Sequence, residues 1–214
     1  MQSSELSGFP VALNLAGRRV LVVGGGDEAT QKVPRLLAAG AEVTLVAPEV
    51  GSTLAQAAAA QSLRWFARAF VPSDVLGAQV VLLTLQDLEL ARSLRGLARR
   101  ERFLLGAIDQ PAYSDFFLVS VVSSGPVQIA ISTNGRAPLL ARRLRQALEA
   151  ALDARFGEFA RNFAELRARV RSLSKAARSE VLERALVGFA MEVRLRYPES
   201  DGHAGLPPEE AREL

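Results

Sequence analysis

Short apolar runs alternate with amphipathic stretches along the first half of the chain. Runs of four to six mostly apolar residues predict strands, and apolar residues three and four positions apart predict helices. The strands are expected at 18–23, 42–47, 63–68, 80–84 and 103–108, and the helices at 30–39, 52–61 and 87–101. This alternation predicts a parallel sheet with helices on its faces.

The pattern changes after Pro111. Two strand-like runs, Phe116–Val122 and Val127–Ser132, are joined by Ser123–Pro126, which predicts an antiparallel hairpin. Because an isolated hairpin is barely stable, this one is expected to need a partner sheet or a second subunit. Pro138 is well placed to begin a helix.

From Leu139 onward the apolar residues recur at helical spacing, so packed helices are expected, the last of them over 175–196. The phenylalanines between 156 and 163 are interpreted as core packing. The tail, 197–214, is expected to be disordered. Within the first helix, Pro34 removes a backbone donor and is expected to kink the helix or force a local adjustment.

Composition excludes several kinds of chemistry. The chain has 214 residues, is 49% hydrophobic and contains no cysteine, so it can bury a core but has no disulfide framework, thiolate metal site or cysteine nucleophile. Its single histidine, His203, lies in the tail, which argues against a histidine metal cage or a Ser-His-Asp triad. The N-terminus lacks a signal-peptide pattern, and no apolar stretch could cross a bilayer, so a cytoplasmic protein without membrane contact is expected.

The positive charge is carried almost entirely by arginine. The net charge is +3 and Lys32 and Lys175 are the only lysines. The planar guanidinium fork binds carboxylates and phosphates, so an acidic ligand is one explanation, and genomic base composition is another. Nucleic acid is disfavoured as a partner because the arginines alternate with glutamates and few aromatic residues lie among them.

The most specific local motif follows the first predicted strand. Residues 24–29 read Gly-x-Gly-x-x-Ala, directly before a helical stretch that Gly40 ends. In a βαβ unit the first glycine makes a tight turn, the second lets a pyrophosphate approach, and the small third residue allows close packing. The helix start then binds the phosphates. An ordinary strand-to-helix turn without a ligand is the alternative.

Ligands on parallel sheets bind at the carboxyl ends of the strands, which extends the predicted dinucleotide site to the ends of other strands. The predicted cofactor residues are Gly24, Gly25, Gly26, Asp27, Glu28, Ala29, Ala47, Pro48, Thr84 and Leu85. No metal ligands are predicted.

In their order and spacing these pieces resemble the precorrin-2 dehydrogenase/sirohydrochlorin ferrochelatase family, the N-terminal module of siroheme synthases. The likeness covers roughly residues 9 to 170. It is carried by Phe9–Pro10, Leu13–Arg18, Val20–Ala29, Lys32, Ala38–Pro48, Ile108–Asp109, Asp115–Phe116, Gln128–Gly135 and Pro138–Arg145.

The resemblance implies an NAD⁺-dependent enzyme that oxidises precorrin-2 to sirohydrochlorin, and a homodimer formed through the middle domain. Some members also insert Fe²⁺, which makes ferrous iron a second candidate substrate. The implied fold class is α/β: a Rossmann-like parallel-sheet domain, a small α+β dimerisation domain and a helical C-terminal domain. Their expected bounds are 1–113, 114–150 and 151–196.

The family's key acid corresponds to Asp109, which closes the fifth predicted strand. Beside a nicotinamide, a carboxylate can remove a proton as hydride leaves the macrocycle. The competing interpretation of Asp109 is a turn cap before Pro111.

The tetrapyrrole substrate of the family carries many carboxylate groups, which arginine forks can bind. The predicted substrate residues are Thr133, Asn134, Gly135, Arg136 and Arg142. The competing interpretation of these arginines is a solvated helix face.

Three departures from the family pattern matter. Leu85-Gln86-Asp87 stands where Thr-Asp-Asp is usual, Gly106 replaces an asparagine, and Ala137 replaces a serine. They motivate an alternative function, a divergent and non-catalytic module that binds a dinucleotide or a tetrapyrrole. Because Ala47-Pro48 offers no acidic ribose ligand, the choice between NAD⁺ and NADP⁺ stays open. A channel-regulating dinucleotide sensor fits less well, because of the hairpin and the helical C-terminal part.

Overall fold

The computed structural model describes residues 8–197, and the chain divides into two compact units. One contains the residues up to Val122 together with Gln128–Ala151, and the other contains Ser123–Val127 and the residues from Leu152 onward. The first unit therefore holds the parallel sheet, and the second holds the hairpin turn and the last helices.

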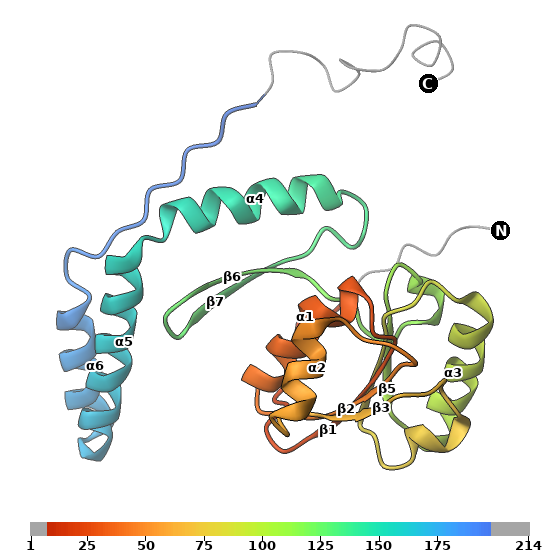
Figure 1. Ribbon diagram of the computed structural model, residues 1–214. Coiled ribbons are helices and arrows are strands. Elements are labelled where there is room, and N and C mark those ends of the chain that lie inside the picture. Colours follow the sequence, from red (N-terminus) through yellow and green to blue (C-terminus); the bar gives the residue numbers. More distant parts are fainter. Residues whose placement is uncertain (1–7, 198–214) are drawn as a thin grey trace, which may run out of the picture. The chain divides into compact units, whose positions relative to one another are not determined.

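The first unit is built on a five-stranded sheet in the order β3-β2-β1-β4-β5, with all neighbours parallel (Figure 1). Its strands are β1 (Arg19–Val23), β2 (Glu42–Val46), β3 (Arg64–Phe66), β4 (Val80–Leu83) and β5 (Leu104–Ala107). Each lies within the range predicted from its apolar run, so the predicted α/β fold with a parallel sheet is confirmed.

Helices cover both faces of this sheet. Figure 1 shows α1 (Asp27–Ala38) and α2 (Ser52–Ala59) on one face and α3 (Leu88–Glu101) on the other. Alternate residues of each strand point to opposite faces. Val20 and Val22 therefore pack with α1 and α2, and Leu21 and Val23 pack with α3.

Helix α1 begins three residues before the predicted start at Thr30 and continues for four residues beyond Pro34. After the helix, Gly40 adopts a φ of +78°, a left-handed conformation that suits glycine at a helix end. The predicted end of the helix at Gly40 is confirmed.

An ion pair fixes the connection between β3 and β4, which contains the short 3-10 helix Pro72–Val75. Arg68 donates two hydrogen bonds to the carboxylate of Asp74, at 2.8 and 2.6 Å, and the Val71 N–H donates a third at 2.8 Å. The pKa of Asp74 lies below its usual value, chiefly because of the hydrogen bond from Arg68. This ion pair therefore stabilises the connection above acidic pH and loses its effect as Asp74 takes up a proton.

The predicted hairpin is present as β6 (Ser120–Ser124) and β7 (Val127–Ile131), but its first strand begins later than predicted. Residues 116–119 are not part of a strand because the chain just before them is held against β5. The Asp115 N–H donates to the Leu105 carbonyl at 2.6 Å, and the Asp115 carboxylate accepts from the Leu105 N–H at 3.0 Å. The sequence run alone carried no sign of this contact.

The second unit contains α5 (Ala154–Arg169), the 3-10 turn η3 (Val170–Ser172) and α6 (Lys175–Ala185). Phe159 stacks on Phe163 and on Phe189, with ring centroids 6.3 and 5.3 Å apart, and Phe156 lies 6.2 Å from Phe189. These contacts agree with the interpretation of the phenylalanines as packing residues.

The prediction that the last helix reaches Arg196 is wrong. Helix α6 ends at Ala185, and Gly188 adopts a φ of +84°. From there to Tyr197, apolar side chains occupy every second position and all of them are exposed. A period of two is typical of an extended strand and does not form a helical stripe. The predicted disordered tail, from 198 onward, lies outside the described residues.

The hairpin turn contacts α5 through two glycines. Gly125 has a φ of +58°, and a Cβ on it would lie 2.6 Å from the carbonyl oxygen of Gly157. Gly125→Ala is expected to lower the free energy of unfolding of this unit by about 1–3 kcal/mol, through backbone strain and this collision. Urea unfolding followed by circular dichroism measures the change.

Gly188→Ala is the matched control, because Gly188 lies in the same unit and has a φ of +84°, but its Cβ would meet nothing within 4 Å. It carries the backbone cost alone and should destabilise less. Equal losses in the two variants would mean that the contact with α5 contributes nothing.

Candidate functional site

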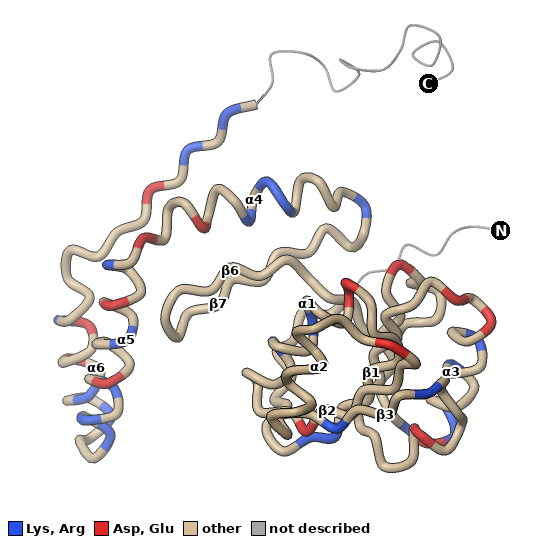
Figure 2. The backbone as a smooth tube through the Cα atoms, viewed as in Figure 1, with Lys and Arg blue, Asp and Glu red and all other residues tan. Residues whose placement is uncertain are grey.

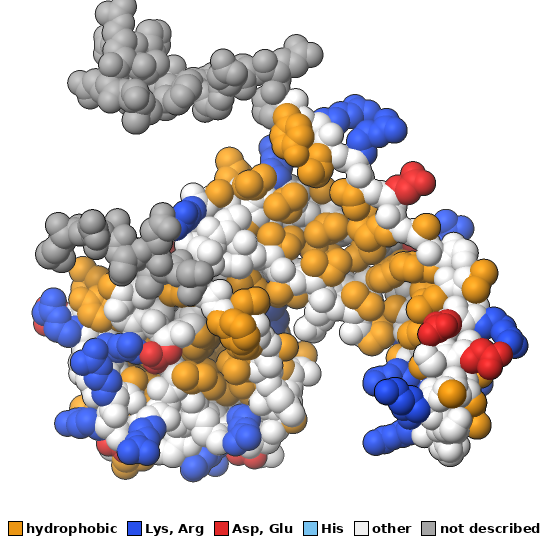
Figure 3. Space-filling view, turned by 180° about the vertical axis from the view of Figure 1, so that it is seen from behind, with side chains coloured by type: hydrophobic (Ala, Val, Ile, Leu, Met, Phe, Trp, Pro, Cys, Tyr) orange, Lys and Arg blue, Asp and Glu red, His pale blue; other side chains and the backbone are white. Residues whose placement is uncertain are grey.

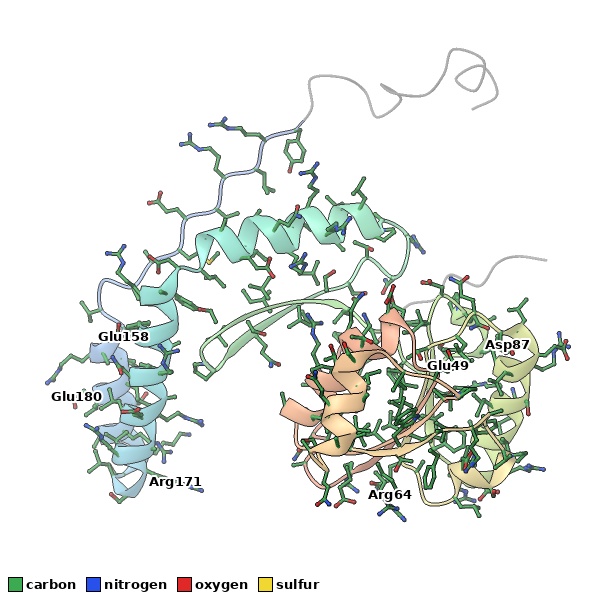
Figure 4. All side chains as sticks on the ribbon, in the orientation of Figure 1. Glu49, Arg64, Asp87, Glu158, Arg171 and Glu180 are labelled. Atoms are coloured by element: carbon green, nitrogen blue, oxygen red, sulfur yellow. The ribbon has the colours of Figure 1, made fainter. Side chains whose placement is uncertain are left out.

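The carboxyl ends of β2, β1, β4 and β5 lie next to one another in the sheet, because these strands are parallel neighbours in that order. The structure thereby brings together the predicted cofactor residues, which follow β1, β2 and β4, and Asp109, which follows β5. In Figure 4, Glu49 and Asp87 mark the loops after β2 and β4 at this edge.

Gly24 makes the turn out of β1. It is buried, its φ is +110°, and a Cβ there would lie 2.5 Å from Thr84 Oγ1 and 2.7 Å from Leu85 Cγ. The Thr84 hydroxyl in turn donates to the Val23 carbonyl at 3.0 Å. Only glycine fits here, because the turn has a left-handed backbone and passes directly against the end of β4.

Gly25 also leaves no room for a side chain, because of the loop after β2. A Cβ on Gly25 would lie 2.2 Å from the carbonyl oxygen of Glu49 and 2.9 Å from Ala47 Cβ. The Gly-x-Gly-x-x-Ala motif accepts any residue at position 25. The sequence therefore did not predict that Gly25 allows the turn to pack against the loop after β2.

Gly26 faces open space. It is exposed, its Cβ would meet nothing within 4 Å, and it stands at the N-cap of α1 without a side-chain capping bond. Ala29, one turn later, is completely buried, so the small residue of the motif does pack closely. The first N–H groups of α1 therefore lie beside a surface that a phosphate could approach. These residues fit the pyrophosphate of a dinucleotide.

Two acidic residues occupy the first turn of α1, Asp27 and Glu28. Glu28 forms an ion pair with Lys32 at 3.3 Å, which offsets one negative charge next to the predicted phosphate position.

The end of β2 is fixed by a hydrogen bond from Trp65 Nε1 to the Ala47 carbonyl, at 3.0 Å. Ala47 is buried, and Pro48 and Glu49 are exposed. Glu49 was not among the predicted site residues, although its carboxylate is the first after β2 that could accept a hydrogen bond from ribose hydroxyls.

Asp109 lies two residues beyond β5 with a φ of +57°, and its side chain is exposed. Its Oδ2 accepts a hydrogen bond from Gln86 Nε2 at 3.2 Å. The following 3-10 turn, Pro111–Tyr113, has no side-chain cap. The carboxylate is thus available at the edge of the sheet and does not act as the cap that the competing interpretation required.

A second glutamine joins the same two strand ends. Gln110 is buried, and its Nε2 donates to the Leu85 carbonyl at 2.8 Å. Its Oε1 is buried without a hydrogen-bond partner. The two glutamines, Gln86 and Gln110, therefore connect the loop after β4 to the loop after β5, and neither was predicted.

Gln110→Leu is expected to change the free energy of unfolding by less than about 1 kcal/mol. Nε2 loses its hydrogen bond to the Leu85 carbonyl and a longer one, at 3.4 Å, to the Ile108 carbonyl, but this loss is offset by removing an unpaired buried oxygen. Thr84→Val is the control, since it deletes the buried bond to Val23 and relieves no such oxygen. Urea unfolding should find Thr84→Val the more destabilised variant. The reverse order would show that the bond to Leu85 outweighs the unpaired oxygen.

The glycine at 106, where the family has asparagine, has a structural cause. A Cβ on Gly106 would lie 2.6 Å from the ring of Phe116. The phenylalanine ring therefore lies against the position where an asparagine side chain would begin.

The predicted substrate residues lie on another turn of the first unit, between β7 and α4 (Pro138–Ala151). Asn134 and Gly135 adopt left-handed backbones, with φ of 52° and 76°. Thr133 Oγ1 accepts the Ala137 N–H at 3.3 Å. These backbone conformations and this hydrogen bond define the turn. Arg136 lies within it, and Arg142 is exposed on α4.

Within residues 8–197, no three His, Cys, Asp or Glu side chains come close enough together to hold a metal ion. In the same part of the chain, no helix is both long and apolar enough to cross a membrane.

Two family models match the chain, one after the other. Residues 11–120 match the model of a family described as putative NAD(P)-binding, and residues 124–151 match one described as sirohaem biosynthesis protein central. The predicted family resemblance is thereby confirmed.

Among curated proteins, "Siroheme synthase 3" of Aeromonas hydrophila is 37% identical over 164 residues, which are 77% of this chain and 35% of that protein. A siroheme synthase of Methylococcus capsulatus is 34% identical over 190 residues, 88% of this chain and 40% of that protein. The chain thus spans 35–40% of the length of these relatives. Among solved structures, "SirC, precorrin-2 dehydrogenase" is 25% identical with a TM-score of 0.72 and covers 96% of both chains.

Proposed function

Because the chain belongs to the putative NAD(P)-binding family, we propose that it is an NAD⁺-dependent enzyme that oxidises precorrin-2 to sirohydrochlorin. The observation that carries this proposal is the exposed carboxylate of Asp109 at the edge of the sheet where the open glycine turn lies. The likeness to a precorrin-2 dehydrogenase over nearly the whole chain supports it.

In this proposal the N–H groups after Gly26 bind the pyrophosphate, with Asp27, Glu28 and Ala29 forming the first turn of α1. Ala47 and Pro48 border the adenosine half, and Thr84 and Leu85 border the nicotinamide half. Bound NAD⁺ supplies the hydride acceptor. The affinity for NAD⁺ relative to NADP⁺ is measured directly by titrating each.

Asp109 is the proposed catalytic base. As a hydride leaves the macrocycle, the carboxylate accepts the proton that leaves with it and passes this proton to water. The hydrogen bond from Gln86 holds the carboxylate in place, and the left-handed backbone of Asp109 turns the chain out of β5.

The turn after β7 is proposed to bind the substrate. Arg136 and Arg142 supply guanidinium groups for tetrapyrrole carboxylates, and Thr133, Asn134 and Gly135 supply polar groups between them. We also propose a homodimer formed through 114–150, and Fe²⁺ as the substrate of a second step on the same tetrapyrrole.

Anaerobic incubation of the protein with precorrin-2 and NAD⁺ tests the proposal. Formation of equal amounts of NADH and sirohydrochlorin is expected. Binding of NAD⁺ or sirohydrochlorin without turnover would instead favour the non-catalytic binding module. Fe²⁺ added after oxidation tests chelation, and size-exclusion chromatography with light scattering tests the dimer.

A further inference from the structure

The helical unit contains a hollow of about 490 Å³ lined by Ala164, Arg167, Ala168, Arg171 and Arg178. The first four recur at spacings of three and four residues along the sequence, so they lie on one face of α5 and its continuation into η3. The two alanines leave room between the arginine side chains. Arg178 reaches the hollow from α6, on the other side of the turn.

Within the described residues, none of these three arginines has an acidic partner, although other arginines on the same helices do. Arg169 pairs with Glu165 at 3.8 Å, and Arg184 pairs with Glu180 at 2.8 Å. The first turn of α6, nearest the hollow, has no acidic residue.

The figures also show positive charge gathered at one end of α5 and α6. Basic positions of α5 and α6 gather near the turn that joins the helices in Figure 2, and Lys and Arg side chains gather at that end in Figure 3. In Figure 4, Arg171 lies at this end, and the acidic residues Glu158 and Glu180 lie farther along the helices.

A second hollow, of about 550 Å³ beside α3, provides a contrast. It is also lined by arginines, Arg92 and Arg100, but Glu89 lines it too and pairs with Arg92 at 3.4 Å. That hollow supplies its own counter-charge. The hollow between α5 and α6 does not.

Three like charges around one hollow repel one another, and an anion between them removes that repulsion. Each guanidinium fork can donate to two oxygens of a phosphate or carboxylate. The volume lies in the usual range for small-molecule sites. We propose that this hollow binds a small anion with two or more phosphate or carboxylate groups, as a second ligand site in a different unit from the dinucleotide site.

Calorimetric titration of the full chain with inorganic pyrophosphate, and separately with citrate, tests this site. Saturating NAD⁺ is present throughout to occupy the glycine turn. Saturable binding of at least one of the two anions is expected. Tighter binding of pyrophosphate would identify a phosphate ligand, and tighter binding of citrate a carboxylate ligand.

Arg171→Gln and Arg178→Gln are each expected to raise the Kd about tenfold, since each removes a charge-assisted contact. The controls Arg169→Gln and Arg184→Gln remove the same charge from the same helices outside the hollow, and should stay within about twofold of the wild-type Kd. Melting temperatures confirm that all four variants fold.

Absence of saturable binding, or equal weakening in hollow variants and controls, would overturn the proposal. The comparison does not depend on the enzyme activity, because all four substitutions lie in the helical unit. If NAD⁺ did not bind, a higher Kd for the anion in the two hollow variants than in the two controls would still show that the hollow binds it.

Discussion

Asp109→Asn is expected to slow NAD⁺-dependent oxidation of precorrin-2 by about 100-fold or more, the usual contribution of a proton acceptor. The affinity for NAD⁺ and the melting temperature should stay at their wild-type values. Asparagine has nearly the same shape, and its amide oxygen can still accept the hydrogen bond from Gln86. What it loses is the ability to take up a proton. The initial rate of NADH formation measures the effect.

The backbone makes asparagine a sharper choice than alanine. Asp109 has a φ of +57°, a left-handed conformation that asparagine tolerates and that costs other residues about 1–2 kcal/mol. A rate lost in Asp109→Ala could therefore reflect a displaced loop. The asparagine variant separates the proton acceptor from the shape of the turn.

Asp87→Asn is the matched control at the same edge of the sheet. Asp87 caps α3 by accepting the Leu90 N–H at 2.9 Å, and asparagine is an equally good N-cap. Wild-type rates are expected for this variant. If Asp109→Asn also oxidised precorrin-2 at the wild-type rate, Asp109 would not be the base.

Features encoded by local patterns could be predicted from the sequence. The apolar runs Val20–Val23 and 80–84 are buried on both faces, as strands of a covered parallel sheet must be, so these runs identified the sheet and its edge. The glycine motif placed the turn before α1, because a left-handed Gly24 and a small buried Ala29 are requirements of that turn.

Features that depend on contacts between distant residues could not be predicted. The bond from Gln110 to Leu85 spans 25 positions, and Gly106 is explained only by the ring of Phe116. The end of α6 was missed for another reason, since the period-two pattern after Gly188 was present in the sequence but was interpreted as a continuing helix.

Gly26→Ala is expected to raise the Kd for NAD⁺ at least about tenfold, because a methyl group would occupy the position at which the pyrophosphate approaches the helix. The free energy of unfolding should fall by no more than about 1 kcal/mol, the usual difference between glycine and alanine at an N-cap. The protein itself offers no obstacle, since this Cβ meets nothing within 4 Å. Trp65, the only tryptophan, bonds to Ala47 at this edge, so its fluorescence can follow the titration.

Gly25→Ala separates loss of binding from loss of structure. Its Cβ would lie 2.2 Å from the Glu49 carbonyl, so the loop after β2 must move, at a cost of about 1–3 kcal/mol. Both stability and NAD⁺ affinity should fall in this variant, whereas Gly26→Ala should lose affinity alone. If Gly26→Ala bound NAD⁺ as the wild type does, the open face of the turn would not be where the pyrophosphate lies. The glycines would then serve only the strand-to-helix turn, and the base at Asp109 would need a hydride acceptor bound elsewhere.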